Sequence, residues 1–195
     1  MDRIGLIRGC QQGDPGSFEQ LYKSYSKNAL GTAYLIAKHR DIAEDIVQEA
    51  FFQCYRGIKK LKDPDAFDVW FYKLLVRLAW KMTSEYRHTK PLDELQDEVV
   101  TGISQLDAAL EGKENKLILY EAVGKLSLPL RTVIILHYFN DMTIKQIAMV
   151  LDCFQGTVKS RLHNARKQLE AELRSSFDED FYKTMYMEKE CKING

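Results

Sequence analysis

The sequence predicts an all-α protein: two small helical domains joined by an acidic linker, the C-terminal one a helix-turn-helix. Three observations support this prediction. Apolar residues recur three and four positions apart almost throughout, and no long stretch alternates as a strand would. Residues 91–113 break the pattern with acidic residues and glycine. Residues 143–169 read as two short helices separated by a tight turn.

The zero net charge hides two basic blocks. The 195 residues include 28 basic and 28 acidic ones, and this balance argues against a generic polyanion binder. Hydrophobic residues make up 45% of the chain, which argues against a disordered protein. Residues 56–90 have nine cations and four acids, and residues 140–169 have five and two. The stretches 93–121 and 170–195 are acidic, with eight acids against two cations and seven against four. This distribution suggests two contact surfaces.

The sequence lacks the motifs of enzymes and metal proteins. Its four cysteines are isolated, as expected of thiols in a reducing cytosol, and no Cys or His residues have zinc-ligand spacing. Without a glycine-rich phosphate loop or a nucleophile motif, we expect no catalytic residue, cofactor, metal or small-molecule substrate. The polar N-terminus does not fit a signal peptide, and no apolar run is long enough to span a bilayer. We therefore expect a cytoplasmic protein without membrane insertion.

Residues 1–90 are expected to form the first domain. Its predicted elements are a helix at 17–39, a helix at 41–58, a charged loop at 59–67 and a helix at 68–88. Ser17, which follows Gly13-Asp14-Pro15, is the expected N-cap of the first of these helices.

The helix at 41–58 has an acidic ridge opposite its apolar face. The apolar face comprises Ile42, Ile46, Val47, Ala50 and Phe51, and the ridge comprises Asp41, Glu44, Asp45, Gln48 and Glu49. Carboxylates on such a ridge are usually solvated or meet a basic partner, whereas catalysis would need a pocket that shifts their pKa values. The pattern therefore favours a solvated or docking face over an active site.

The helix at 68–88 carries cations and tryptophans away from its apolar stripe. At about 100° per residue, the stripe is formed by Phe71, Leu75, Leu78 and Met82. The other face comprises Trp70, Lys73, Arg77, Trp80 and Lys81. Aromatic rings beside cations suit unstacked bases held on a phosphate track. The alternative is that Trp70 packs on a neighbouring helix and only the cations are exposed.

Residues 114–175 are expected to form the second domain, which contains the helix-turn-helix. Thr143 is a good N-cap for a helix with an apolar stripe at Ile144, Ile147, Ala148 and Leu151. After the turn, a second helix buries Val158, Leu162, Ala165 and Leu169 along one edge. Its remaining face has hydrogen-bond donors and no acid: Thr157, Lys159, Ser160, Arg161, His163, Asn164, Arg166 and Lys167. Such a face can enter a major groove, and the alternative is a solvated basic face.

The stretch "LPLRTVIILHYFNDMTIKQIAMVLDCFQGTVKSRLHNARKQL" (128–169) resembles domain four of bacterial RNA polymerase sigma factors, most closely the short extracytoplasmic-function (ECF) group. "GTVKSRL" followed by "ARKQL" is a specific signature of that group. The resemblance implies a transcription-initiation factor whose second helix reads the minus-35 promoter element. The turn Asp152-Cys153-Phe154 departs from the glycine and the small or proline residue that are more usual there.

The stretch "DIAEDIVQEAF" (41–51) resembles the sigma region that docks on the clamp helices of the largest polymerase subunit. The resemblance implies that the acidic ridge is a docking surface, with Asp45, Gln48 and Glu49 as its main contacts.

The stretch "AFDVWFYKLLVRLAW" (66–80) resembles the sigma region that opens the minus-10 element. Trp70 and Lys73 match its motif, and Arg77 replaces the usual Asn. The resemblance also implies that the preceding loop captures a flipped base, through Lys59, Lys60 and Lys62.

The resemblance implies core RNA polymerase and promoter DNA as partners, together with a dedicated anti-sigma factor. The acidic linker would lower the affinity for free DNA, because it repels phosphate. The alternative reading is a helix-turn-helix transcription regulator that acts as a dimer and is not a sigma subunit. Residues 176–195 form a tail to which the sequence assigns no role.

Overall fold

The part of the chain that the computed structural model describes, residues 2–89 and 113–174, is built from helices only, as the sequence predicts. The N-terminal unit contains α1 (Arg3–Gln12), α2 (Pro15–Ala37), α3 (Arg40–Gly57), the 3-10 turns η1 (Ile58–Lys60) and η2 (Pro64–Ala66), and α4 (Phe67–Thr89). The C-terminal unit contains α5 (Lys113–Lys125), α6 (Leu128–Ile134), the π-helical turn η4 (Ile135–Phe139), α7 (Ile144–Val150) and α8 (Gln155–Leu173). The predicted linker up to residue 112 and the predicted tail 176–195 lie outside the described residues.

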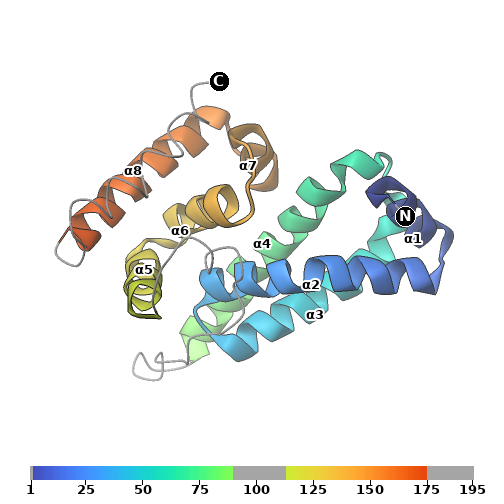
Figure 1. The fold of residues 1–195 in the computed structure, drawn as a ribbon, viewed down its shortest axis with the longest axis horizontal. Coiled ribbons are helices and arrows are strands. Elements are labelled where there is room, and N and C mark those ends of the chain that lie inside the picture. Colours follow the sequence, from blue (N-terminus) through green and yellow to red (C-terminus); the bar gives the residue numbers. More distant parts are fainter. Residues whose placement is uncertain (1, 90–112, 175–195) are drawn as a thin grey trace.

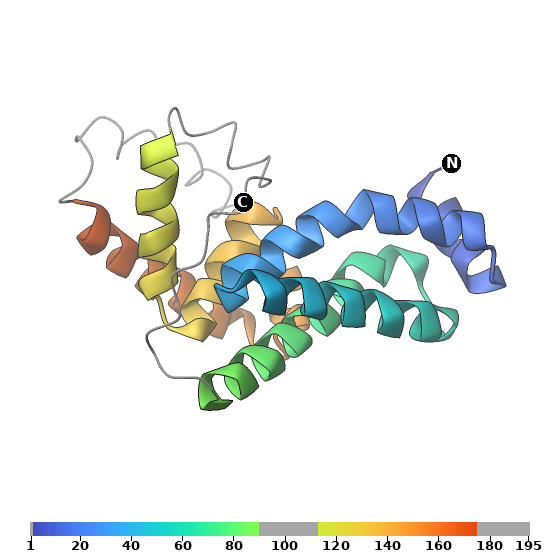
Figure 2. The ribbon, with the colours of Figure 1, turned by 90° about the horizontal axis from the view of Figure 1, so that it is seen from below.

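The two units lie against each other along α4. Helices α2, α3 and α4 pack together, with α1 at one end of them, and α5 to α8 lie toward the other end (Figure 1). Helix α4 contacts α7, and α2 contacts both α6 and η4, so N-terminal and C-terminal helices share an interface. Seen from below, α4 crosses behind α3, and the C-terminal part of α4 (green) lies below α3 (Figure 2).

Helix α1 was not predicted, although both of its caps are visible in the sequence. The Asp2 carboxylate accepts a hydrogen bond from the Gly5 amide at 2.8 Å, and Gly13 ends the helix with a left-handed φ of 87°. The predicted N-cap of α2 is wrong: the cap is Asp14, whose carboxylate accepts from the Ser17 amide at 2.9 Å. Pro15 suits the first helical position because the amide that it lacks would have no partner there. The helix therefore begins two residues before Ser17.

The N-terminal core forms where the apolar faces of α2, α3 and α4 meet. All five residues of the predicted apolar face of α3 are buried: Ile42, Ile46, Val47, Ala50 and Phe51. On α4, Phe71, Leu75 and Ala79 are fully buried, whereas the predicted Leu78 and Met82 are only partly buried. The buried face of α4 is thus rotated slightly from the predicted stripe.

The helix-turn-helix has the predicted cap and buried edge. The Thr143 hydroxyl accepts a hydrogen bond from the backbone N–H of Gln146 at 3.3 Å. The side-chain oxygen of Gln146 in turn accepts one from the backbone N–H of Thr143 at 2.9 Å, which completes a capping box. The predicted buried residues of α8, Val158, Leu162, Ala165 and Leu169, are all buried. In the turn, Asp152 has a left-handed φ of 49°, a conformation that Asp and Asn adopt more readily than most residues.

We expect Thr143→Ala to lower the free energy of unfolding by about 1 kcal/mol, because it removes the side-chain cap of α7. Ser127→Ala is the matched control, since Ser127 is the N-cap residue of α6 and makes no side-chain cap hydrogen bond. Urea denaturation of both variants measures the difference. Equal losses for the two would contradict the capping role of Thr143.

Candidate nucleic-acid interface

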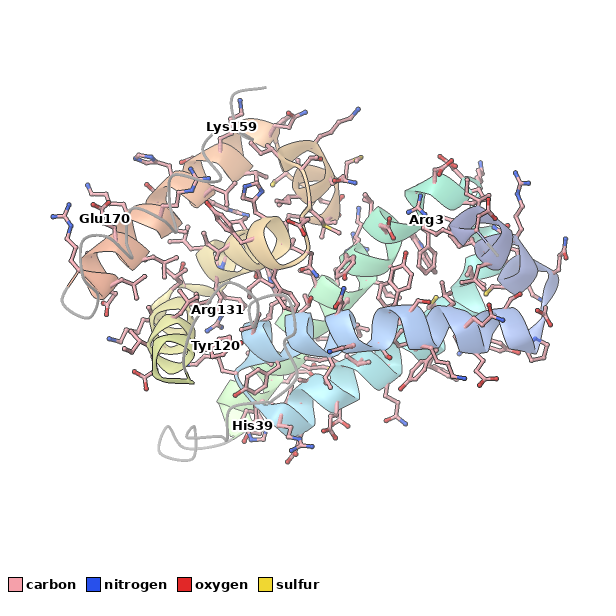
Figure 3. All side chains as sticks on the ribbon, viewed as in Figure 1. Arg3, His39, Tyr120, Arg131, Lys159 and Glu170 are labelled. Carbon is pink, nitrogen blue, oxygen red and sulfur yellow. The ribbon has the colours of Figure 1, made fainter. Side chains whose placement is uncertain are left out.

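The outward face of α8 is open along most of its length. Of the eight predicted residues, five are exposed: Lys159, Ser160, His163, Asn164 and Lys167. Thr157 and Arg161 are partly buried. Figure 3 shows Lys159 on the outer side of α8, away from α6. The helix therefore presents a row of hydrogen-bond donors without a carboxylate among them, up to Glu170.

Arg166 differs from the other predicted residues of α8 because it turns inward. Its Nε donates to the Tyr138 hydroxyl at 2.8 Å, and its guanidinium lies 5.7 Å from the centroid of that ring. The charged group is held by a cation–π contact and a hydrogen bond within the C-terminal unit. Arg166 therefore fixes α8 against η4 instead of belonging to the exposed face.

The two tryptophans of α4 are partly buried, not exposed as the wheel suggested. Trp70 packs over the end of α3, where a Cβ on Gly57 would lie 3.1 Å from the ring. This is the alternative that the sequence left open for Trp70. The Trp80 indole Nε1 donates to the Thr132 hydroxyl of α6 at 2.9 Å, so Trp80 lies at the interface between the units.

The cations between the tryptophans are paired with an acid of the helix-turn-helix. The Arg77 guanidinium is 2.7 Å from one carboxylate oxygen of Asp152, and the Lys73 ammonium binds the other. These two hydrogen bonds, the one from Lys73 foremost, hold the pKa of Asp152 below its ordinary value. Lys81 is exposed and lies 4.0 Å from Glu85 on the same helix. The predicted DNA-opening face of α4 is thus partly covered by the turn that precedes α8.

A buried amide also joins the two units. Asn140 Nδ2 donates to the Thr32 hydroxyl at 2.9 Å and to the Tyr72 hydroxyl at 3.0 Å. Thr32 is fully buried and Tyr72 is 6% exposed. Burial raises the pKa of Tyr72 to about 12, so its hydroxyl stays protonated. The π-helical turn η4 ends in an Asn140 N–H bond to the Ile135 carbonyl at 3.1 Å, which positions this side chain.

The loop before α4 is fixed from the N-terminal helix. Its three predicted lysines, Lys59, Lys60 and Lys62, are exposed. Gln11 of α1 donates through Nε2 to the Leu61 carbonyl at 2.6 Å and lies 3.3 Å from the Ile58 carbonyl. Sequence reasoning missed Gln11, because a glutamine that bonds to backbone 50 residues away leaves no local pattern.

The acidic ridge of α3 is exposed and continues into an aromatic patch. Of the ridge, Asp41, Glu44, Asp45 and Gln48 are exposed, and Glu49 is partly buried and accepts from Gln53 at 2.6 Å. Tyr22, Phe52 and Tyr55 are 46%, 54% and 58% exposed, respectively, and the Tyr55 ring packs on Phe18 at a centroid distance of 5.0 Å. These three aromatic residues were not predicted as contact residues from the sequence. Exposed apolar patches of this kind mark contact surfaces.

The described residues form neither a metal-binding cluster nor a membrane-spanning helix. No group of three or more His, Cys, Asp or Glu residues is placed there to hold a metal ion. Among the same residues, no helix is both long and apolar enough to cross a membrane.

A helix-turn-helix with an acid-free donor face, packed on a helical unit with a second cationic face, defines a DNA-binding protein. The family models agree with this class and narrow it. Sigma-70 region 2 matches residues 21–90, and sigma-70 region 4 matches residues 116–169.

Curated relatives extend the likeness over most of the chain. The sigma factor SigV of Bacillus subtilis is 31% identical over 72% of this chain and 81% of its own length. The ECF sigma-E factor of Haemophilus influenzae is 29% identical over 85% of this chain and 92% of its own length. The chain therefore belongs to the sigma-70 family of RNA polymerase sigma factors, in the ECF group. It is a transcription-initiation factor that directs core RNA polymerase to promoters, and not the stand-alone dimeric regulator that the sequence left open.

A solved structure shows the same fold. The sigma factor RpoE of Bartonella quintana, in complex with the anti-sigma factor NepR, aligns with a TM-score of 0.65 at 21% identity, over 82% of this chain and 98% of that one. As a family, sigma factors are not enzymes.

Because Arg166 is held inside the C-terminal unit, Arg166→Ala should lower the free energy of unfolding by about 1–3 kcal/mol. The neighbouring exposed cation gives the control: Lys167→Ala should change it by less than about 0.5 kcal/mol. Denaturant titration of both variants is the measurement. If the two variants were equally stable, the inward role of Arg166 would be wrong.

Proposed function

We propose that α8 reads the minus-35 element as duplex DNA, with Lys159, Ser160, Arg161 and Asn164 as the main contacts. One observation carries this proposal: α8 offers a row of exposed donors without an acid, along a helix whose opposite edge is buried in the unit. Lysine and arginine neutralise phosphates or donate to guanine, and asparagine pairs with adenine. Thr157, His163 and Lys167 flank this group and would contact the backbone. Arg166 would act by orienting α8.

We infer that the domain of residues 1–90 opens the minus-10 element. The exposed loop lysines Lys59, Lys60 and Lys62 and the cations Lys73, Arg77 and Lys81 supply a phosphate track. Trp70 and Trp80, which are both partly buried, border this track. The domain of residues 114–175 would then place α8 upstream, with residues 91–113 joining the two.

We propose that the outer face of α3 docks on core RNA polymerase. The ridge residues Asp41, Glu44, Asp45, Gln48 and Glu49 suit a basic partner, and the exposed Phe52 and Tyr55 continue the same face with apolar area. Aromatic side chains that become buried when a partner binds, with polar groups around them, often contribute most of the binding free energy of an interface. An anti-sigma factor, like the one bound to the Bartonella relative, is a further proposed partner, and the cytoplasm is the proposed compartment.

The test of minus-35 reading is run-off transcription with core polymerase and fragments of the source genome. Wild type should start transcription at specific sites. Lys159→Ala should weaken promoter binding by the holoenzyme and lower the slope of log binding constant against log salt concentration by about one. Lys23→Ala, on an exposed cation of α2 that pairs with Glu19, is the matched control. No transcript from any fragment with wild type would refute the proposal.

The docking proposal predicts that Asp45→Lys weakens binding to core polymerase at least about tenfold, because it places a like charge against a basic partner. Glu19→Lys makes the same charge change on an exposed residue of α2. Binding is measured by fluorescence titration of the labelled protein with core enzyme. Similar affinities for the two variants would place the docking surface elsewhere.

A further inference from the structure

The two proposed DNA-reading faces are in different states in this structure. Most outward residues of α8 are exposed, whereas Lys73 and Arg77 of α4 are paired with a carboxylate. Both oxygens of Asp152 are used, one by Lys73 and one by Arg77. A carboxylate that bridges an ammonium and a guanidinium takes the place that a nucleic-acid phosphate takes when it binds such a pair. Asp152 thus sits where the minus-10 strand would have to bind.

Asp152 cannot hold the units together by itself. The side chains of Lys73, Asp152 and Arg77 are 28%, 55% and 66% exposed, and exposed ion pairs of this kind shift an equilibrium at most about fivefold each. The buried hydrogen bonds are the stronger link. Asn140 reaches across to Thr32 and Tyr72, and Trp80 reaches across to Thr132, all at 2.9–3.0 Å and with both threonines fully buried. A buried polar group that loses its partner is costly unless water replaces it.

The bonds that Asn140 and Trp80 make are directed between the units. The Asn140 side chain bonds only to residues of α2 and α4 in the described chain, and the Trp80 indole N–H bonds to α6. Each of these bonds joins a residue of one unit to a residue of the other. The backbone at Asp152 also adopts a left-handed conformation that glycine would adopt without strain. The carboxylate stands at a turn position where no side chain is required for the turn itself.

We propose that the free protein keeps itself closed: the buried bonds of Asn140 and Trp80 fasten the two units, and Asp152 competes with DNA phosphate for Lys73 and Arg77. The proposal rests on the assignment of α4 to minus-10 binding. It adds that the C-terminal unit regulates that site. In the closed form α8 remains free to approach duplex DNA, but Lys73 and Arg77 cannot bind a strand until Asp152 leaves.

The experiment uses the full-length protein without polymerase and a short fluorescent single-stranded oligonucleotide of mixed sequence. Asp152→Asn removes the charge and keeps a residue that tolerates the left-handed turn. It should bind the oligonucleotide at least about threefold more tightly at low salt, with a steeper salt dependence, because two more cations meet phosphate. Glu172→Gln removes an exposed carboxylate paired with Lys125 inside the C-terminal unit, and should leave both values unchanged.

Small-angle X-ray scattering of the same free proteins tests the closure itself. Wild type should be compact, and Asn140→Ala should have a larger radius of gyration and also bind the oligonucleotide more tightly. Trp80→Phe, which keeps an aromatic ring and loses the indole N–H, is the second variant in case Asn140→Ala folds poorly. Circular dichroism checks folding in each case.

Two results would overturn the proposal. One is an Asp152→Asn variant that binds the oligonucleotide no better than Glu172→Gln. The other is wild-type scattering that already matches separated units and does not change in Asn140→Ala or Trp80→Phe. Neither measurement contains polymerase or a promoter. A failure of the proposed function, which would appear as missing transcripts, is therefore distinguishable from a failure of the closed state.

Discussion

The structure depends on α4, which has to satisfy opposite demands on its two faces. Phe71, Leu75 and Ala79 are fully buried and hold the N-terminal unit together. The other face carries Lys73, Arg77 and Trp80, which no apolar core could accept without partners. In the described chain the partners come from the C-terminal unit, as a carboxylate and a hydroxyl. The arrangement of the two units follows from how that second face is satisfied.

The need of Lys73 and Arg77 for a carboxylate partner also explains where the helix-turn-helix carries its acid. Along α8 the outward residues are cations and neutral donors, and an acid there would repel phosphate. Asp152 lies just before α8, in the turn, so it can point to α4 while the α8 face stays free of acids. One acid in the turn therefore gives the unit a contact with two cations of its own chain and leaves the proposed duplex-binding face of α8 without an acid.

Much of the local structure was predictable, because local rules determine it. The helices of 41–58 and 68–88, the cap at Thr143 and the buried edge of α8 follow from helical period and capping. Helix α1 was missed although Asp2 and Gly13 mark its ends, since its short apolar pattern is weak. What the sequence could not give is the pairing across long separations. Asn140 with Thr32 and Tyr72, Asp152 with Lys73, and Gln11 with the lysine loop join residues that no period relates. For the same reason the tryptophans of α4 looked exposed on a wheel of one helix.

The kinds of contact between the units bear on how firmly they are closed. Exposed ion pairs contribute about 0–1 kcal/mol each and weaken with salt, whereas the net worth of a buried neutral hydrogen bond is about 1 kcal/mol. The polar contacts of this interface therefore stabilise the closed form by a few kcal/mol in total. When the units separate, water hydrogen-bonds to the groups that were buried, and this offsets part of the free energy lost with those contacts. Such an interface can be closed in the free protein and still yield to a partner that binds either unit tightly, because the free energy of one good docking surface exceeds it. An interface made only of apolar side chains would offer no comparable competition for phosphate, since it would leave Lys73 and Arg77 unoccupied. Under the proposed function, the carboxylate of Asp152 makes closure and strand binding compete for the same two cations, Lys73 and Arg77.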